Sequence, residues 1–233
     1  PLPEGLIKED IHWAVASKIP QSRGLKSSAA VSVAAIKSLC QATDTELNDS
    51  EIVDLSSQAQ LRANVSITGS IDDSWACLTK GWKLIDANAE EIADGVIMEG
   101  AGLNPDDWIV IIALRDEREN RPELEDFAPL YNEFEKALLA LQQGEILNCL
   151  TINGRAVCAV TNDIQGRKIS NDAFINGARS SGLTGSGPAV VIVIPSLVSS
   201  SAERIKSTLS RILPKEQIIE TRFLSQDSDE LET

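Results

Sequence analysis

The spacing of apolar positions in the first part of the chain predicts two helices after a short strand. Ile11–Ser17 alternates well enough to favour a strand. Apolar side chains recur at helical spacing within Ala29–Ala42, so this segment is predicted to be a helix. Asn48 followed three residues later by Glu51 resembles a capping box, and a second helix is predicted over Glu51–Asn64.

The rest of the chain mixes the two patterns. The longest apolar runs, Trp108–Leu114 and Ala189–Ile194, have the length of buried strands. Further helices are predicted from Asp73–Leu78 and over Pro122–Leu141, Ile146–Val160, Asp172–Ser180 and Ala202–Leu213, and further strands over Lys83–Asp86 and Gln217–Phe223. Because helices and strands do not alternate strictly, the pattern favours an α+β or mixed α/β class. The turn signal Asn104–Asp107 is a candidate domain boundary.

Composition narrows the function classes. The 233 residues are 42% apolar, enough for one large domain or two small ones. A formal net charge of −14 argues against nucleic acid and anionic membranes as partners, because both require clustered cations. No signal peptide and no apolar run of about 20 residues is visible. The four cysteines form no CxxC pair, which indicates reduced thiols and a cytoplasmic protein without structural zinc.

The first candidate site is the segment PQSRGLKSSAA, which leads into the first predicted helix. Gly24 can expose backbone amides, Ser28 can donate to phosphate or ligate Mg²⁺, and Arg23 and Lys26 add positive charge. A helix N-terminus also favours an anion. The residues expected to contact phosphate are Arg23, Gly24, Leu25, Lys26, Ser27, Ser28 and Ala29. From the residues alone, an ordinary loop with a serine N-cap is an equally good interpretation.

Two carboxylates form the second candidate site, in the segment SITGSIDD. Asp72 or Asp73 could accept a proton from a substrate hydroxyl and orient it for attack on a phosphate. Taken alone, an aspartate N-cap is the simpler interpretation. The cluster of Arg115, Arg118 and Arg121 could meet a carboxylate substrate, although a solvated loop is again the simpler interpretation.

A second glycine-rich loop, SGLTGSGP, precedes the apolar run at Ala189 and forms the third candidate site. Its glycines can hold a tight turn against another loop, and its hydroxyls could donate to phosphate or substrate, although a plain turn is the alternative. The expected binding residues are Thr184, Gly185, Ser186 and Gly187.

In this order, the three segments resemble the motifs of the GHMP kinases, and the resemblance covers Ile11 to Phe223. RGLKSS looks like the archaeal-type shikimate kinases of that superfamily, whereas homoserine kinases typically have glycine in place of Lys26. The resemblance implies a two-domain α+β fold, with an S5-like domain over residues 1–102 and a ferredoxin-like domain over residues 103–233. The implied reaction is phosphorylation of shikimate by ATP with Mg²⁺, with Ser28 on the metal.

Asp72 maps best onto the family's catalytic position, and Asp73 is the close alternative. The third motif would close over the phosphate loop. No N-terminal family motif precedes that loop, so the chain is expected to be N-terminally incomplete. Ser56–Asn64 also lacks the acid that ligates Mg²⁺ in several members. Another GHMP kinase such as a homoserine kinase, or an inactive ligand-binding module, therefore remains as an alternative. The oligomeric state stays open, with a homodimer as one candidate.

Overall fold

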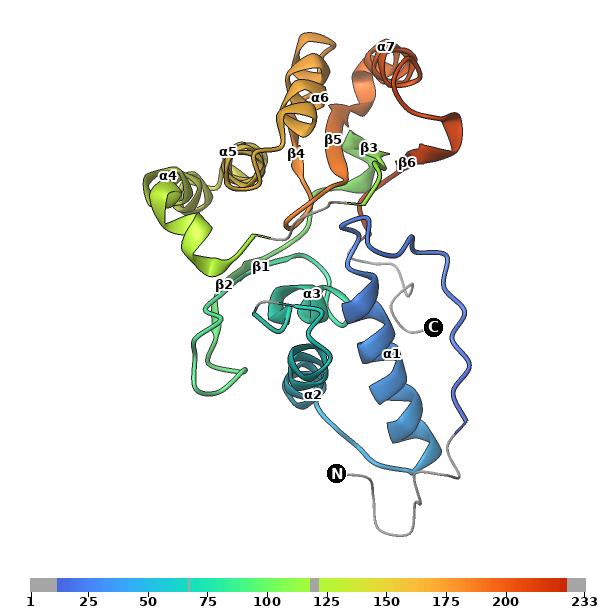
Figure 1. The fold of residues 1–233 in the computed structure, drawn as a ribbon, viewed down its shortest axis with the longest axis vertical. Coiled ribbons are helices and arrows are strands. Elements are labelled where there is room, and N and C mark those ends of the chain that lie inside the picture. The colour runs from blue at the N-terminus through green and yellow to red at the C-terminus, as the bar shows by residue number, and fades with distance from the viewer. Residues whose placement is uncertain (1–11, 67, 118–121, 226–233) are drawn as a thin grey trace. The chain divides into compact units, whose positions relative to one another are not determined.

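A computed structural model describes residues 12–66, 68–117 and 122–225 (Figure 1). The chain divides into two compact units, the first comprising residues 1–20 and 27–100 and the second residues 21–26 and 101–233. This division lies close to the expected boundary after residue 102. However, the six residues of the expected phosphate loop, 21–26, group with the second unit rather than the first.

The first unit contains three helices and an antiparallel hairpin. Its elements are α1 (Ser27–Ala42), α2 (Asp49–Arg62), α3 (Ile71–Ala76), β1 (Trp82–Ile85) and β2 (Val96–Gly100). The predicted capping box is confirmed at the start of α2, where Asn48 Oδ1 accepts from the Glu51 amide at 3.0 Å. The Glu51 carboxylate accepts from the Asn48 amide at 2.8 Å. A small apolar cluster around Val53, Ile71 and Trp75 joins α2 and α3.

The predicted strand over Ile11–Ser17 is wrong in its described part. Residues 12–17 form no strand, and their side chains are exposed. Trp13 and Val15 are 55% and 64% exposed. The alternation of this segment therefore has no described sheet to pair with, and alternation without a partner does not make a strand.

The second unit is a four-stranded antiparallel sheet with helices. Its elements are β3 (Trp108–Ala113), α4 (Tyr131–Gln142), α5 (Ile146–Val160), α6 (Ile164–Ile175), β4 (Ser180–Leu183), β5 (Val190–Pro195), α7 (Ser199–Leu209) and β6 (Ile218–Thr221). The strand order is β4-β5-β3-β6. Four strands in this order, with helices in the crossovers after the first and third, give the expected ferredoxin-like topology. Short 3₁₀ turns lie at Pro105–Asp107, Leu124–Leu130, Ser196–Val198 and Lys215–Gln217.

Continuous apolar runs on the two central strands build the main core. Ile111 and Ala113 of β3 pair in register with Ile192 and Val190 of β5, and all four are fully buried. Apolar residues of α5, α6 and α7 pack against this face, for example Ile205. The sheet is thus covered on this face by helices, which fixes the position of the loop between β4 and β5.

Candidate functional site

Two glycine-containing loops of the second unit pack directly on each other. The Thr184 hydroxyl donates to the Gly24 carbonyl at 2.5 Å, and the Ala189 amide donates to the Arg23 carbonyl at 3.1 Å. Gly24 has φ +80, and a Cβ there would lie 2.5 Å from the Gly187 carbonyl oxygen. The structure therefore brings the first and third predicted motifs together, with glycine required at their contact.

Lys26 lies across the glycine-rich loop. A Cβ on Gly185 would overlap the Nζ and Cε atoms of Lys26. Lys26 itself has φ +59 and Gly185 has φ +49, so both backbones turn sharply at this point. Ser186 is partly buried in the same loop. An ammonium group is thereby held beside the two loops that the sequence identified.

A buried ion pair between Arg115 and Asp163 holds the second glycine-rich loop at Pro188. The guanidinium of Arg115 donates to Asp163 Oδ1 at 2.8 Å and also pairs with Oδ2, and its Nε donates to the Pro188 carbonyl at 2.7 Å. Arg23 donates to the Arg115 carbonyl and pairs with Asp116 at 3.0 Å. The interpretation of Arg115 as solvated is therefore wrong, since it is only 8% exposed; Arg118 and Arg121 lie outside the described residues.

Asp163 serves two partners at once. Besides pairing with Arg115, it accepts from the Gly166 amide at 2.8 Å and so caps α6. A Cβ on Gly166 would lie 2.7 Å from Asp163 Oδ2, which explains the glycine. The surroundings are buried enough to raise the pKa of the neighbouring Cys158 thiol to about 11, through desolvation first and the Asp163 charge second.

The first loop continues along the chain into α1, which belongs to the first unit. The first amides of a helix have no intrahelical partners, so this end can bind an anion. Ser27 is the first residue of α1, and Ala29 is fully buried. The Ser28 hydroxyl donates to Gln60 Oε1 of α2 at 3.0 Å.

A ladder of buried hydroxyls and one amide joins the three helices of the first unit. Ser32 and Ser56 lie 2.5 Å apart, and Ser56 and Ser74 lie 2.9 Å apart. Gln60 Nε2 is 3.3 Å from Ser56 Oγ. Sequence reasoning missed these residues, although Ser28 and Ser32 on α1, and Ser56 and Gln60 on α2, have the i, i+4 spacing that places polar groups on one helix face.

The two carboxylates follow a left-handed turn at the start of α3. Gly69 and Ser70 have φ +78 and +50, and the helix begins one residue later. Asp72 is exposed, whereas Asp73 is partly buried. The charge of Asp73 adds to burial in raising the pKa of the Cys77 thiol. Of the two candidates, Asp72 is thus the more accessible to a substrate.

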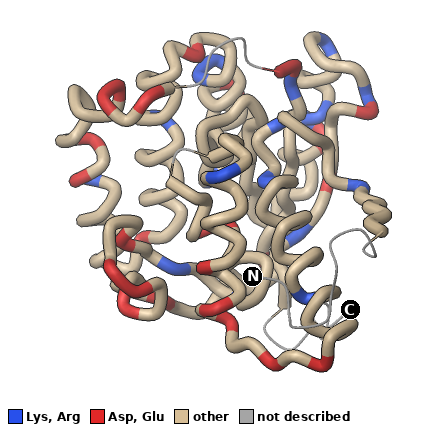
Figure 2. The backbone as a smooth tube through the Cα atoms, turned by 60° about the horizontal axis from the view of Figure 1, so that its bottom comes forward, with Lys and Arg blue, Asp and Glu red and all other residues tan. Residues whose placement is uncertain are grey.

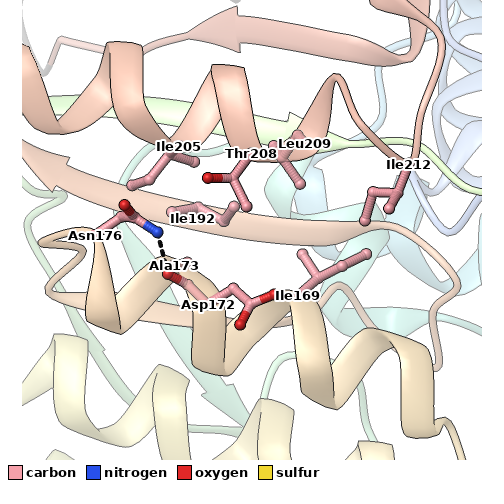
Figure 3. Close-up of a pocket in the computed structure, with 9 residues that line it drawn as sticks. All are labelled: Ile169, Asp172, Ala173, Asn176, Ile192, Ile205, Thr208, Leu209 and Ile212. Carbon is pink, nitrogen blue, oxygen red and sulfur yellow. Dashed lines mark hydrogen bonds between the residues drawn. The ribbon is translucent and has the colours of Figure 1, made fainter.

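Other parts of the described chain give weaker evidence for a functional site. Within it, no group of three or more His, Cys, Asp or Glu residues could hold a metal ion, and no helix has the length and hydrophobicity to cross a bilayer. Acidic positions are spread over helices and loops (Figure 2). A small groove between α6 and α7 (Figure 3) is lined mainly by isoleucine, leucine and alanine. In it, the Asn176 side-chain amide donates to the Asp172 carbonyl at 2.8 Å.

Comparison with known proteins supports the fold and relates the chain to small-molecule kinases. Residues 3–81 match the family model of the GHMP kinase N-terminal domain. Two solved structures share the fold: a mevalonate kinase (TM-score 0.61, 20% identity, covering 89% of this chain and 66% of that one) and a putative homoserine kinase from Listeria monocytogenes (TM-score 0.57, 19% identity, 89% and 69%). The chain therefore resembles the GHMP kinases over residues 3–81, and the expected α+β two-domain fold is confirmed.

Several curated sequences that resemble this chain are archaeal shikimate kinases. The chain is 28% identical to the shikimate kinase of Methanothermobacter thermautotrophicus, over 78% of this chain and 62% of that protein. It is 30% identical to the shikimate kinase of Pyrococcus abyssi, over 62% and 51%. It is 27% identical to the shikimate kinase of Methanocella arvoryzae, over 91% of this chain and 72% of that protein. The chain thus spans about half to three quarters of these archaeal relatives.

Proposed function

We propose that this chain belongs to an ATP-dependent small-molecule kinase that phosphorylates the 3-hydroxyl of shikimate. The observation that carries the proposal is the loop Arg23–Lys26, which is seated on the second glycine-rich loop and continues into the N-terminus of α1. Archaeal relatives named shikimate kinase support the acceptor. Four free cysteines agree with a reducing, cytoplasmic setting.

The loop has the properties that a triphosphate requires. Arg23 and Lys26 supply positive charge, and the start of a helix such as α1 favours an anion. The Thr184 proton is directed at the Gly24 carbonyl, so we assign Thr184 to holding the loop rather than to binding phosphate. Gly185, Ser186 and Gly187 of the second loop are the other residues that would contact the phosphates.

Magnesium would rest on few protein atoms. Mg²⁺ commonly keeps several waters and binds through one or two protein groups plus substrate phosphates, so the lack of an acidic cluster in the described chain fits this mode. Ser28 is the candidate ligand, because its proton is donated to Gln60 and its oxygen lone pairs remain available. The ion would offset the charge of the phosphates.

Asp72 would act on the acceptor. Its carboxylate would take the proton of the shikimate hydroxyl as that oxygen bonds to the γ-phosphorus and the bond from phosphorus to the bridging oxygen breaks, which releases ADP. Because positioning and charge dominate such reactions, we expect Asp72→Asn to lower kcat by about 10²–10³-fold. Asp73→Asn should have the smaller effect, since that carboxylate is partly buried.

A coupled ADP-release assay on the complete gene product, with shikimate and homoserine offered in parallel, tests the proposal. ADP release that depends on shikimate and is lost in Asp72→Asn would support it. Release that depends on homoserine would move the acceptor to that amino acid. Binding of ATP without turnover on either acceptor would favour an inactive ligand-binding module instead.

A further inference from the structure

Gln60 is a deeply buried polar side chain that contacts Ser28 at the start of α1. Its side chain is 2% exposed, and its amide group contacts two different segments of the first unit. Its Oε1 accepts from the Ser28 hydroxyl at 3.0 Å. Its Nε2 lies 3.2 Å from the Gly69 carbonyl and 3.4 Å from Ser74 Oγ. One side chain thus connects the start of α1 with the turn that precedes Asp72.

These bonds fix what Ser28 can do. A hydroxyl has one proton and two lone pairs, so a serine whose proton is donated to a fixed acceptor can present only lone pairs elsewhere. Lone pairs are what a hard cation such as Mg²⁺ binds. Gln60 therefore keeps Ser28 in the state of an oxygen ligand, without contributing a charge itself.

An amide suits this position better than a carboxylate. Its NH₂ group donates toward the Gly69 carbonyl, which is an acceptor only, and a carboxylate there would face that carbonyl with no proton to share. A charge at 2% exposure would also be costly to desolvate. The position is thus built for a neutral group that accepts on one side and donates on the other.

We propose that Gln60 is a positioning residue for the metal-nucleotide: it orients the Ser28 hydroxyl as a ligand oxygen and ties it to the Gly69 turn. The inference rests on the proposed kinase function. It gives Gln60 an indirect role at the metal, through Ser28, in the stretch Ser56–Asn64 that has no acid. Orienting partners of metal ligands typically change metal affinity by 10–100-fold when removed.

Isothermal titration calorimetry with a non-hydrolysable ATP analogue, with and without Mg²⁺, tests this inference on the complete gene product. We expect Gln60→Met to reduce the gain in affinity that Mg²⁺ provides by about tenfold, while metal-free nucleotide binding changes little. We expect Ser28→Ala to cause the same loss. Because Gln60 acts through Ser28, the double variant should lose no more than either single variant.

Gln58→Met is the matched control. Gln58 is the same residue type two positions away on α2, and its amide bonds Asp54 at 2.9 Å rather than Ser28. It should leave both affinities unchanged. If Gln60→Met fails to fold, Gln60→Asn replaces it: the amide stays neutral but is one methylene shorter, so it should no longer reach the Ser28 hydroxyl and the Mg²⁺-linked gain should fall as in Gln60→Met.

The outcomes separate the two proposals. A wild-type protein that binds no nucleotide contradicts the kinase function itself. Nucleotide binding with equal losses in the presence and absence of Mg²⁺, additive losses in the double variant, or an undiminished Mg²⁺-linked gain in Gln60→Asn would overturn the role of Gln60 alone.

Discussion

The buried pair of Arg115 and Asp163 allows a quantitative test of how the glycine-rich loop is held. Asp163→Ala removes the partner of an arginine side chain that is 9% exposed, and leaves that charge unpaired in the core. It also removes the cap that accepts from the Gly166 amide. Both losses act on the support of the loop that ends at Pro188.

The expected cost follows from the two losses. Breaking a buried ion pair by removing one partner costs about 3–5 kcal/mol. Loss of an N-cap adds about 1 kcal/mol. Asp163→Asn keeps an acceptor for the cap and removes only the charge, so its cost should be about 1 kcal/mol smaller than that of Asp163→Ala. The Arg115→Met and Asp163→Ala double variant removes both charges, and should be more stable than Asp163→Ala alone.

Urea denaturation followed by circular dichroism and by tryptophan fluorescence measures these differences. Trp108 opens β3 of the second unit and reports on its sheet, alongside the other three tryptophans of the chain. A loss below about 1 kcal/mol for Asp163→Ala, or a double variant less stable than both single variants, would refute the argument that the unpaired charge dominates.

Three further predictions concern other positions. Burial raises the pKa of Cys158 in the folded chain from 9.0 to about 11, so the thiol ionises first in the unfolded chain. The free energy of unfolding should therefore fall between pH 9 and pH 11, by about 2–3 kcal/mol at most. In urea titrations, Cys158→Ala should flatten this fall. Gly69→Ala should destabilise far more than Gly144→Ala in thermal melts, because both have similar positive φ but only Gly69 faces a close neighbour. Thr184→Val should cost about 1–2 kcal/mol and raise the KM for ATP, because the Gly24 carbonyl loses its donor; an unchanged KM would contradict the loop-holding role.

Elements with a strong hydrophobic pattern could be predicted from the sequence. Strands that form because they pair with a neighbouring strand could not. The apolar run at Ala189–Ile194 became β5 with a shift of one residue. In contrast, β4 has the sequence SSGL, which has little strand propensity and is a strand because it pairs with β5. The helix predicted over Asp172–Ser180 is instead Ile164–Ile175, since the Asp163 cap was not identified. The strand β2 was also missed.

The candidate site also contains residues that could be predicted from the sequence and residues that could not. Reactive types in a motif, such as Lys26 and Asp72, could be named from the sequence, and their roles remain predictions. Gln60 was not identified, and Arg115 was considered only as a partner for a substrate carboxylate, because an amide on a helix and an arginine after a strand look solvated until burial is known. Their importance depends on which carbonyls and carboxylates lie beside them, and only the folded chain specifies that.

The seating of the first loop on the second has a consequence for how the chain is made. The hydrogen bond from Thr184 to Gly24 spans 160 residues, so during synthesis the loop emerges long before its partner exists. Residues 21–26 must wait until the sheet around β5 has been translated, although the flanking residues of the first unit can fold earlier. A ribosome that stalls before Ala189 would hold a chain in which helices of the first unit can form while residues 21–26 still lack their partner loop.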